Sequence, residues 1–225
     1  MNTRTETKSL DVVTIVGGQP AVLCHEKALW LPAMGTIIVS DLHFGKAAHF
    51  RKHGLAMPCQ MDEANIAKLE GLLARTLAQH LVFSGDAFHS EANLALERFR
   101  AWRHSLPHIT FRLVRGNHDI LSSAWYVALG MAVVEGSLEL GNIAICHDPA
   151  DAVPTEDLYF LAGHVHPAVR LQGAGRQSLA LPCFLFGKSQ GLLPAFGAFT
   201  GNHIVRPTPA DRVWVCTGER VLAVR

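Results

Sequence analysis

The sequence predicts an α/β (α+β) fold in which two β-sheets pack face to face with helices on the outside. Between residues 36 and 114, apolar strand-like runs alternate with segments of helical periodicity, which is typical of a parallel sheet covered by helices. After Asp119, short apolar runs follow one another closely with Gly and Pro between them, which favours a second, more antiparallel sheet. No linker separates the two halves, so we expect one domain over residues 1–225, with the polar residues 1–10 flexible.

The first half combines short strands with two helices. A loop without acidic residues, Phe44–Met61, follows the buried strand that ends at Asp41. Apolar residues recur at helical spacing in Gln60–Gln79 and again in Asn93–His104. The other apolar runs predict strands at Val12–Val16, Ala21–Cys24, Ala28–Leu31, Leu81–Phe83 and Thr110–Val114.

The second half has a short helix around Ser123–Leu129 and then strands. Glycine and proline between the apolar runs mark the turns. The predicted strands are Ala132–Glu135, Leu138–Leu140, Ile143–Cys146, Tyr159–Leu161, Val169–Leu171, Ser178–Leu181, Phe184–Phe186, Gly197–Phe199, His203–Val205 and Val213–Cys216.

Composition narrows the class of protein. The formal net charge is +1, so no overall field attracts the chain to nucleic acid, and any such attraction must be local. Five scattered cysteines without a Cys-x-x-Cys pair indicate reduced thiols in the cytoplasm and argue against a disulfide framework or a structural zinc site. The polar N-terminus and the lack of a long apolar stretch predict neither a signal peptide nor a membrane span.

Potential metal ligands follow the apolar runs, at the point where each strand ends. Ligands in open α/β sheets bind outside the carboxyl ends of the strands, so these side chains should share one site. They are Asp41 and His43, then Asp86, then Asn117 and His118, then His147, and finally His164 and His166.

Oxygen and nitrogen ligands without thiolates suit manganese, iron or zinc. Two ions about 3.5–4 Å apart need a ligand that touches both, and Asp86, in Ser-Gly-Asp-Ala-Phe, is the natural candidate. Such a pair lowers the pKa of a shared water, which supplies hydroxide for in-line attack on phosphorus. A histidine near the ions that does not ligate them could protonate the leaving oxygen.

Five blocks, in this order, resemble the signature of the calcineurin-like metallophosphoesterases. They are Asp41-Leu42-His43, Gly85-Asp86, Gly116-Asn117-His118-Asp119, His147 and Gly163-His164-Val165-His166. The resemblance implies a four-layer sandwich of two mixed β-sheets flanked by helices. It also implies that Asp41, His43 and His166 hold one metal, that Asn117, His147 and His164 hold the other, and that Asp86 bridges them. His118 would be the acid or phosphate-contacting residue, with Asp119 orienting its imidazole.

A closer resemblance is carried by the stretch from Ser40 to Gly54, by Ser-Gly-Asp-Ala-Phe-His-Ser around Asp86, and by Arg115 to Asp119. This closer resemblance is to the bacterial ligase-associated DNA repair phosphoesterases, the PdeM subfamily. This implies a DNA nuclease or phosphodiesterase that uses two divalent ions, most simply Mn²⁺, and accompanies a DNA ligase and a helicase. The sequence departs from the phosphoprotein phosphatases at one point. Those enzymes carry an Asp-Arg pair after the bridging Asp. Here His89 and Ser90 stand in its place, which weakens a protein-phosphatase interpretation and makes His89 a candidate phosphate-facing group.

Basic residues near the motifs are candidates for DNA phosphate contacts. The acid-free loop carries Lys46, Arg51 and Lys52, which could grip phosphates beside the scissile bond or could simply be a solvated loop. Arg115 precedes Gly116-Asn117-His118, where a phosphate contact and a surface charge are equally compatible with the sequence. Asp119 could likewise cap the following helix.

These observations predict a two-metal phosphodiesterase acting on DNA, with single-stranded or flapped ends as the most accessible substrate. A small-molecule or nucleotide phosphoesterase with the same metals is the first alternative. A non-catalytic scaffold that keeps only the fold is the second, and the intact ligand set argues against it.

Overall fold

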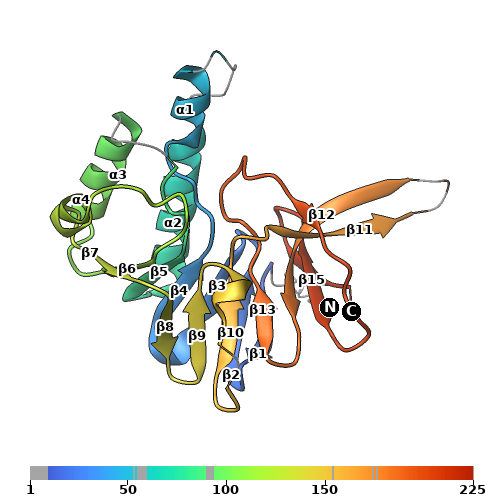
Figure 1. Ribbon diagram of the computed structural model, residues 1–225. Coiled ribbons are helices and arrows are strands. Elements are labelled where there is room, and N and C mark those ends of the chain that lie inside the picture. Colours follow the sequence, from blue (N-terminus) through green and yellow to red (C-terminus); the bar gives the residue numbers. More distant parts are fainter. Residues whose placement is uncertain are drawn as a thin grey trace, which may run out of the picture.

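The computed structural model describes residues 10–52, 54, 60–89, 94–153, 155–173, 175 and 177–224, without the side chains of His49, Lys52 and Leu94. The expected flexibility of residues 1–10 falls almost wholly outside this part of the chain. The described residues form two β-sheets and four α-helices (Figure 1). None of these helices has the length and apolar character to cross a membrane.

The first sheet is mixed and has the strand order β1-β2-β3-β4-β5-β6-β7. Neighbours from β1 to β4 are antiparallel, and neighbours from β4 to β7 are parallel, as the alternation of strand and helix predicts. The strands are β1 (Val12–Val16), β2 (Gln19–Cys24), β3 (Ala28–Leu31), β4 (Thr36–Val39), β5 (His80–Ser84), β6 (Thr110–Val114) and β7 (Met131–Val134).

The second sheet is also mixed and has the order β14-β11-β12-β13-β10-β9-β8, with β15 paired to β12 and β16 to β15. In Figure 1 the hairpin of β11 and β12 projects from the body of the molecule on the side away from the helices. The strands are β8 (Ser137–Leu140), β9 (Ile143–Cys146), β10 (Tyr159–Ala162), β11 (Pro167–Gln172), β12 (Ser178–Phe186), β13 (Gln190–Leu192), β14 (His203–Ile204), β15 (Arg212–Cys216) and β16 (Val221–Ala223).

The helices lie along the parallel part of the first sheet (Figure 1). They are α1 (Lys46–Lys52), α2 (Met61–Thr76), α3 (Leu94–His104) and α4 (Ser123–Ala128), with short 3₁₀ turns at Pro32–Met34 and Pro149–Asp151. The expected fold class, two mixed β-sheets with helices outside, is confirmed.

The central strands bury both faces, which explains why their sequences are apolar without interruption. On β4, Ile37 and Val39 join the cluster under the helices, whereas Ile38 joins the cluster between the two sheets. β5 repeats the pattern, with Phe83 towards the helices and Val82 towards the second sheet. Both clusters consist of buried residues, so the strands that carry the candidate ligands sit in the centre of the molecule.

Four sequence expectations about elements were wrong. The expected strands Ser178–Leu181 and Phe184–Phe186 are one continuous strand, β12. The segment Phe44–Met61 is not all loop, because α1 occupies Lys46–Lys52; the helix has too few apolar residues for a periodic signal. Helix α2 ends at Thr76, before the expected Gln79, since Leu77 adopts the left-handed conformation (φ 54°). The expected strand Gly197–Phe199 is not formed; in this stretch only the neighbouring Ala195 makes an isolated bridge, to Ser40.

Candidate metal centre

The candidate ligands lie where β4, β5, β6, β9 and β10 reach their carboxyl ends. Because β4, β5 and β6 are parallel and in register, their ends meet at one edge of the sheet. Backbone hydrogen bonds then join the loops directly: Asp41 N donates to Gly85 O (3.2 Å), and His43 N donates to Asp86 O (2.9 Å). Backbone hydrogen bonds therefore continue beyond the ends of the strands and hold the ligand-bearing loops together.

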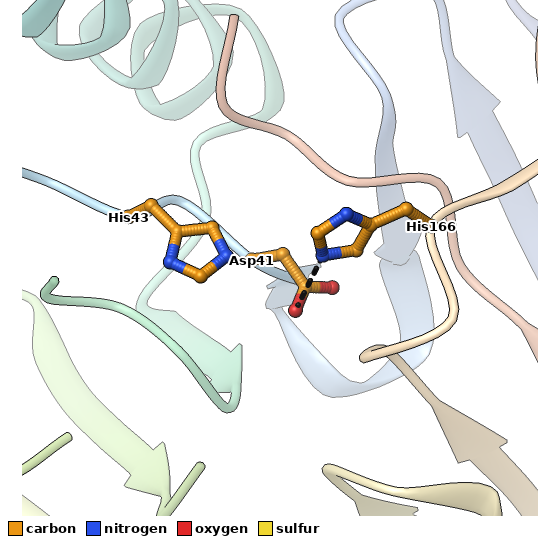
Figure 2. A group of neighbouring side chains, drawn as sticks. All are labelled: Asp41, His43 and His166. Atoms are coloured by element: carbon orange, nitrogen blue, oxygen red, sulfur yellow. Dashed lines mark ion pairs between the residues drawn. The ribbon is translucent and has the colours of Figure 1, made fainter. Parts of the chain in front are cut away.

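Asp41, His43 and His166 form the first group of side chains, and their ligand atoms lie within 4.8 Å of one another. Figure 2 shows the two imidazole rings on either side of the Asp41 carboxylate, with His166 Nε2 3.2 Å from Asp41 Oδ1. Asp41 and His43 are buried, while His166 is partly exposed. These are the three residues that the family resemblance assigns to one metal.

Asp86, His147 and His164 form the second group, again with ligand atoms within 4.8 Å of one another. His147 Nε2 lies 3.1 Å from His164 Nδ1 and 3.0 Å from Asn117 Oδ1. Asn117, His147 and His164, the residues assigned to the other metal, thus converge on one point.

Asp86 lies between the two groups. Its Oδ1 is 3.4 Å from His147 Nε2, and its Oδ2 is 3.7 Å from His43 Nε2. The backbone N–H of His118 donates to Oδ1 (2.9 Å), which fixes the orientation of the carboxylate. One carboxylate therefore faces both sets of ligands, as a bridging ligand must.

The far sides of two candidate ligand rings have their own partners, which the sequence analysis missed. Thr200 O lies 2.9 Å from His166 Nδ1, and Ser84 O lies 3.3 Å from His147 Nδ1. Partners of this kind hold the proton on one ring nitrogen and leave the other, Nε2, free to bind a cation. No sequence signal identifies them, because backbone carbonyls are available at any residue.

Five of the seven non-glycine residues with positive φ in the described part of the chain are candidate ligands. They are Asp41 (50°), His43 (47°), Asp86 (49°), His164 (61°) and His166 (51°). This conformation is strained for a residue with a Cβ, and strain of this kind is concentrated at functional sites. These turns therefore direct all three side chains of the first group, and two of the three in the second, into the site.

Two motif glycines make room for ligands from other segments. A Cβ on Gly85 would lie 2.0 Å from His147 Nδ1, and one on Gly116 would lie 2.3 Å from Asp86 Oδ1. Any larger residue would push a ligand out of place, so both glycines are required by the packing of the site.

His118 and His89 lie beside the first group. The His118 ring centroid is 5.3 Å from that of His43 and 4.9 Å from that of His89, and His89 Nδ1 lies 3.3 Å from His43 Nδ1. His118 is in neither ligand group and is partly exposed. Its imidazole is therefore near the site and accessible to a substrate.

Asp119 joins two loops through its carboxylate. Its oxygens accept hydrogen bonds from Phe88 N (3.1 Å) and Gly116 N (2.9 Å). Burial raises the pKa of Asp119 to about 7, against the lowering effect of these two hydrogen bonds. The alternative that Asp119 caps the next helix is wrong, because the N-cap of α4 is Ser122. Its predicted role in orienting the imidazole of His118 stays a prediction.

Burial and neighbouring charge set the protonation of two candidate ligands. Burial lowers the pKa of His43 to about 2, so its ring is neutral and offers a lone pair. Burial alone would also lower the pKa of His166, but the hydrogen bond and the charge of Asp41 outweigh it and raise the pKa.

The basic residues chosen from the sequence have different surroundings. Arg115 Nε bonds Glu135 Oε1 (2.7 Å), and its Nη1 bonds Asp119 O (2.7 Å), so this side chain holds the motif loop. Lys46 opens α1 beside the site: burial lowers its pKa, and the nearby carboxylates of Asp86 and Asp41 act in the opposite direction. Arg51 and Lys52 lie in the last turn of α1, and the Lys52 side chain is outside the described residues. The phosphate contacts of all four residues stay predictions.

The donor atoms fit divalent cations. Each group presents one carboxylate and two imidazoles within 4.8 Å, and the Asn117 oxygen adds to the second. Mixed oxygen and nitrogen donors suit metals of borderline hardness.

The chain is similar over nearly its whole length to a solved nuclease. The crystal structure of the Pseudomonas putida nuclease MPE matches with a TM-score of 0.80 and 32% identity, covering 95% of this chain and 100% of that one. Two likenesses are distant. The E. coli phosphoesterase Yfce has 15% identity and a TM-score of 0.48, with 84% of this chain and 96% of that chain covered. A predicted phosphoesterase of Streptococcus pneumoniae has 16% identity and a TM-score of 0.32, with 80% of each chain covered.

No protein-family model and no curated protein matches the chain. The match to the nuclease MPE is nevertheless close enough, and covers enough of both chains, to show the family. Together with the two ligand groups and the five sequence blocks, it establishes that this chain belongs to the calcineurin-like metallophosphoesterases.

Proposed function

We propose that this protein is a two-metal phosphodiesterase that hydrolyses DNA phosphodiester bonds, with Mn²⁺ as its working metal. The observation that carries the proposal is the position of Asp86 between the two ligand groups, 3.7 Å from His43 Nε2 and 3.4 Å from His147 Nε2. The similar nuclease from Pseudomonas putida supports the choice of nucleic acid as substrate.

Two divalent ions, when bound, would polarise the phosphoryl oxygens and lower the pKa of a shared water. In this proposal Asp41, His43 and His166 hold one ion, and Asn117, His147 and His164 hold the other. Asp86, which faces both groups, would help to hold both ions. The neutral ring of His43 and the fixed tautomers of His147 and His166 keep the ligand atoms ready without rearrangement.

His118 is the proposed proton donor to the leaving oxygen. Its ring lies beside the first ligand group without belonging to it, and an imidazole in such a place can donate a proton to a leaving oxygen. Asp119 supports this residue by tying the backbone of its loop to Phe88.

The rim of the site suits a nucleic acid strand. Lys46 and Phe199 line the same pocket as His43, and Phe199 is 52% exposed. The ammonium of Lys46 could bind a phosphate, and the exposed ring of Phe199 could stack on a neighbouring base. We assign the same kind of phosphate contact to Arg51, Lys52, His89 and Arg115. Single-stranded or flapped DNA fits best, because its bases are free to stack.

We place the enzyme in the cytoplasm, in a repair pathway shared with a DNA ligase and a helicase. The location is supported by the thiols of Cys24, Cys146, Cys183 and Cys216, which are all free and buried. The pathway is supported by the sequence resemblance alone.

Cleavage of an end-labelled DNA strand in Mn²⁺ tests the proposal. Asp86→Asn keeps the size of the side chain but removes the charge shared by the two groups, so cleavage should be lost. Asp157→Asn, at an exposed carboxylate, should cleave like the unaltered protein. Undiminished cleavage by Asp86→Asn would reject the mechanism. Faster turnover of cyclic nucleotides or nitrophenyl esters than of DNA would replace the substrate assignment with a small-molecule one.

A further inference from the structure

The segment Ala195–Thr200 connects two candidate ligands of the first group. Phe196 N donates to Ser40 O (2.8 Å), and Gly197 N donates to Asp41 O (3.2 Å). Three residues later, Thr200 O lies 2.9 Å from His166 Nδ1. This one segment therefore contacts both Asp41 and His166, the two residues joined by the dashed line in Figure 2.

Two lysines from distant parts of the chain hold this segment from the other side. Lys68, on α2, donates from Nζ to Phe196 O (3.1 Å) and lies 3.9 Å from the centre of the Phe196 ring. Lys27, between β2 and β3, donates from Nζ to Gly197 O (3.2 Å). Consecutive carbonyls of one segment thus each receive an ammonium group.

The hydrogen bonds on the two sides of the segment are coupled through one peptide group. The carbonyl of Phe196 accepts from Lys68, and the N–H of the same peptide unit, on Gly197, donates to Asp41 O. A cation on the carbonyl polarises the peptide and strengthens the N–H as a donor. The approach is close enough to demand glycine, because a Cβ on residue 197 would lie 2.5 Å from Leu42 O.

The lysines occupy these positions against ordinary preferences. Lys27 has a φ of 73°, a conformation that favours glycine or asparagine. Burial lowers the pKa of Lys68 to about 7 and that of Lys27 to about 8, which shows that both ammonium groups lose solvation by water at these positions. An uncharged side chain of similar length, such as methionine, could occupy either position without the cost of burying an ammonium group.

We propose that Lys27 and Lys68 are positioning residues of the metal centre, which hold Phe196 and Gly197 so that Asp41 and His166 stay in place to bind one ion. The inference rests on the proposed two-metal function, because it assigns that ion to the first ligand group. It predicts that the lysines govern the affinity of one metal site and leave the other, built on Asp86, His147 and His164, unaffected.

The test uses the full chain freed of metal. Lys68→Met and Lys27→Met keep the aliphatic stem and remove the ammonium. In calorimetric titration with MnCl₂, the affinity of one of the two binding steps should fall by about tenfold or more, the usual effect of losing an outer partner of a metal ligand. His166→Ala identifies that step. Lys68→Arg restores a cationic donor and should restore binding, and Lys188→Met, at an exposed lysine, should bind like the unaltered chain.

Hydrogen exchange of the Gly197 amide tests, without any metal, whether the two lysines hold the segment Ala195–Thr200 in place. Exchange should be faster in Lys68→Met than in the unaltered chain, because the Phe196 carbonyl loses its cationic partner and the Gly197 N–H of the same peptide then bonds Asp41 O less strongly. Unchanged Mn²⁺ affinities and unchanged Gly197 exchange in both methionine variants would overturn the proposal, as would an equal loss in Lys188→Met. If the unaltered chain binds fewer than two Mn²⁺, the proposed function fails, and the Gly197 exchange still decides the role of the lysines.

Discussion

Asp148 Oδ2 lies 3.5 Å from His164 Nε2, so a carboxylate faces the far nitrogen of a ring whose Nδ1 lies 3.1 Å from His147 Nε2. Histidines that bind metals usually give their other N–H to a carboxylate or a carbonyl. His164 therefore presents Nδ1 to the second ligand group, whereas His147 and His166 present Nε2.

Asp148→Asn should weaken metal binding at the second ligand group by about 10- to 100-fold, because the amide supports the imidazole less well than the carboxylate does. The asparagine oxygen can still accept from Ala150 N, so the local turn is kept. Titration with Mn²⁺ measures the effect. Asp151→Asn, at an exposed acid in the same turn, is the control and should bind normally. Equal affinities in the two variants would contradict the role of Asp148.

Gly85→Ala should lower occupancy at the second group, since the new methyl would lie 2.0 Å from His147 Nδ1. Gly136→Ala is a matched control: both glycines have φ 77°, but a Cβ at position 136 meets nothing within 4 Å. Backbone strain of about 1–2 kcal/mol should therefore be common to both variants. Elemental analysis after dialysis against Mn²⁺ should show metal loss only in Gly85→Ala. Loss of metal from both variants would show that backbone strain causes the effect, and not the contact with His147.

Phe199→Ala should raise KM for single-stranded DNA by the equivalent of about 1–3 kcal/mol, the usual contribution of one stacked base. Turnover of a nitrophenyl ester should not change, because that substrate has no neighbouring base. Phe199→Trp keeps a stacking surface and should retain affinity. Leu179→Ala, at another exposed apolar side chain, should have no effect. A parallel loss on both substrates would show that Phe199 shapes the metal centre instead.

Asp11→Ala should lower the free energy of unfolding at pH 7 by about 1.5–3 kcal/mol, typical of hydrogen bonds to a charged group. Asp11 accepts from His25 N (2.9 Å) and Arg75 Nη1 (2.6 Å). Burial alone would raise the pKa of Asp11, but these partners outweigh it and lower the pKa below 3.8.

A carboxyl whose pKa is lowered by folding stabilises the fold above its unfolded pKa and loses this effect as the pH falls through the folded value. The difference in unfolding free energy between Asp11→Ala and the unaltered protein should therefore shrink below pH 3.8. Urea denaturation at pH 7, 5 and 3 measures it. A difference that stays constant over this range would show that the contribution of Asp11 does not depend on its charge.

The first sheet could be predicted from the sequence because its signal is local. Apolar runs such as Thr36–Val39 and His80–Ser84 are buried on both faces, and the helices between them leave parallel order as the simplest arrangement. The convergence of the candidate ligands could be predicted for a related reason. Asp41, Asp86 and Asn117 directly follow strands, and parallel strands bring their carboxyl ends together.

The parts that could not be predicted depend on contacts between distant segments. Lys27 and Lys68 meet Phe196 and Gly197 across more than a hundred residues, and nothing near either lysine indicates the partner. Helix α1 lacks apolar periodicity because it carries basic residues. The failed strand at Gly197–Phe199 has a similar cause, since its backbone bonds are made to the ligand loop and not to a neighbouring strand.

The left-handed turns at Asp41, His43, Asp86, His164 and His166 have a consequence for engineering the chain. Each such conformation costs a residue with a Cβ about 1–3 kcal/mol, a cost that glycine would largely avoid. Glycine at these five positions would relieve that strain, but it would also remove the carboxylates and imidazoles that they contribute to the two groups. A search for more stable variants should therefore leave these positions untouched and look elsewhere in the chain.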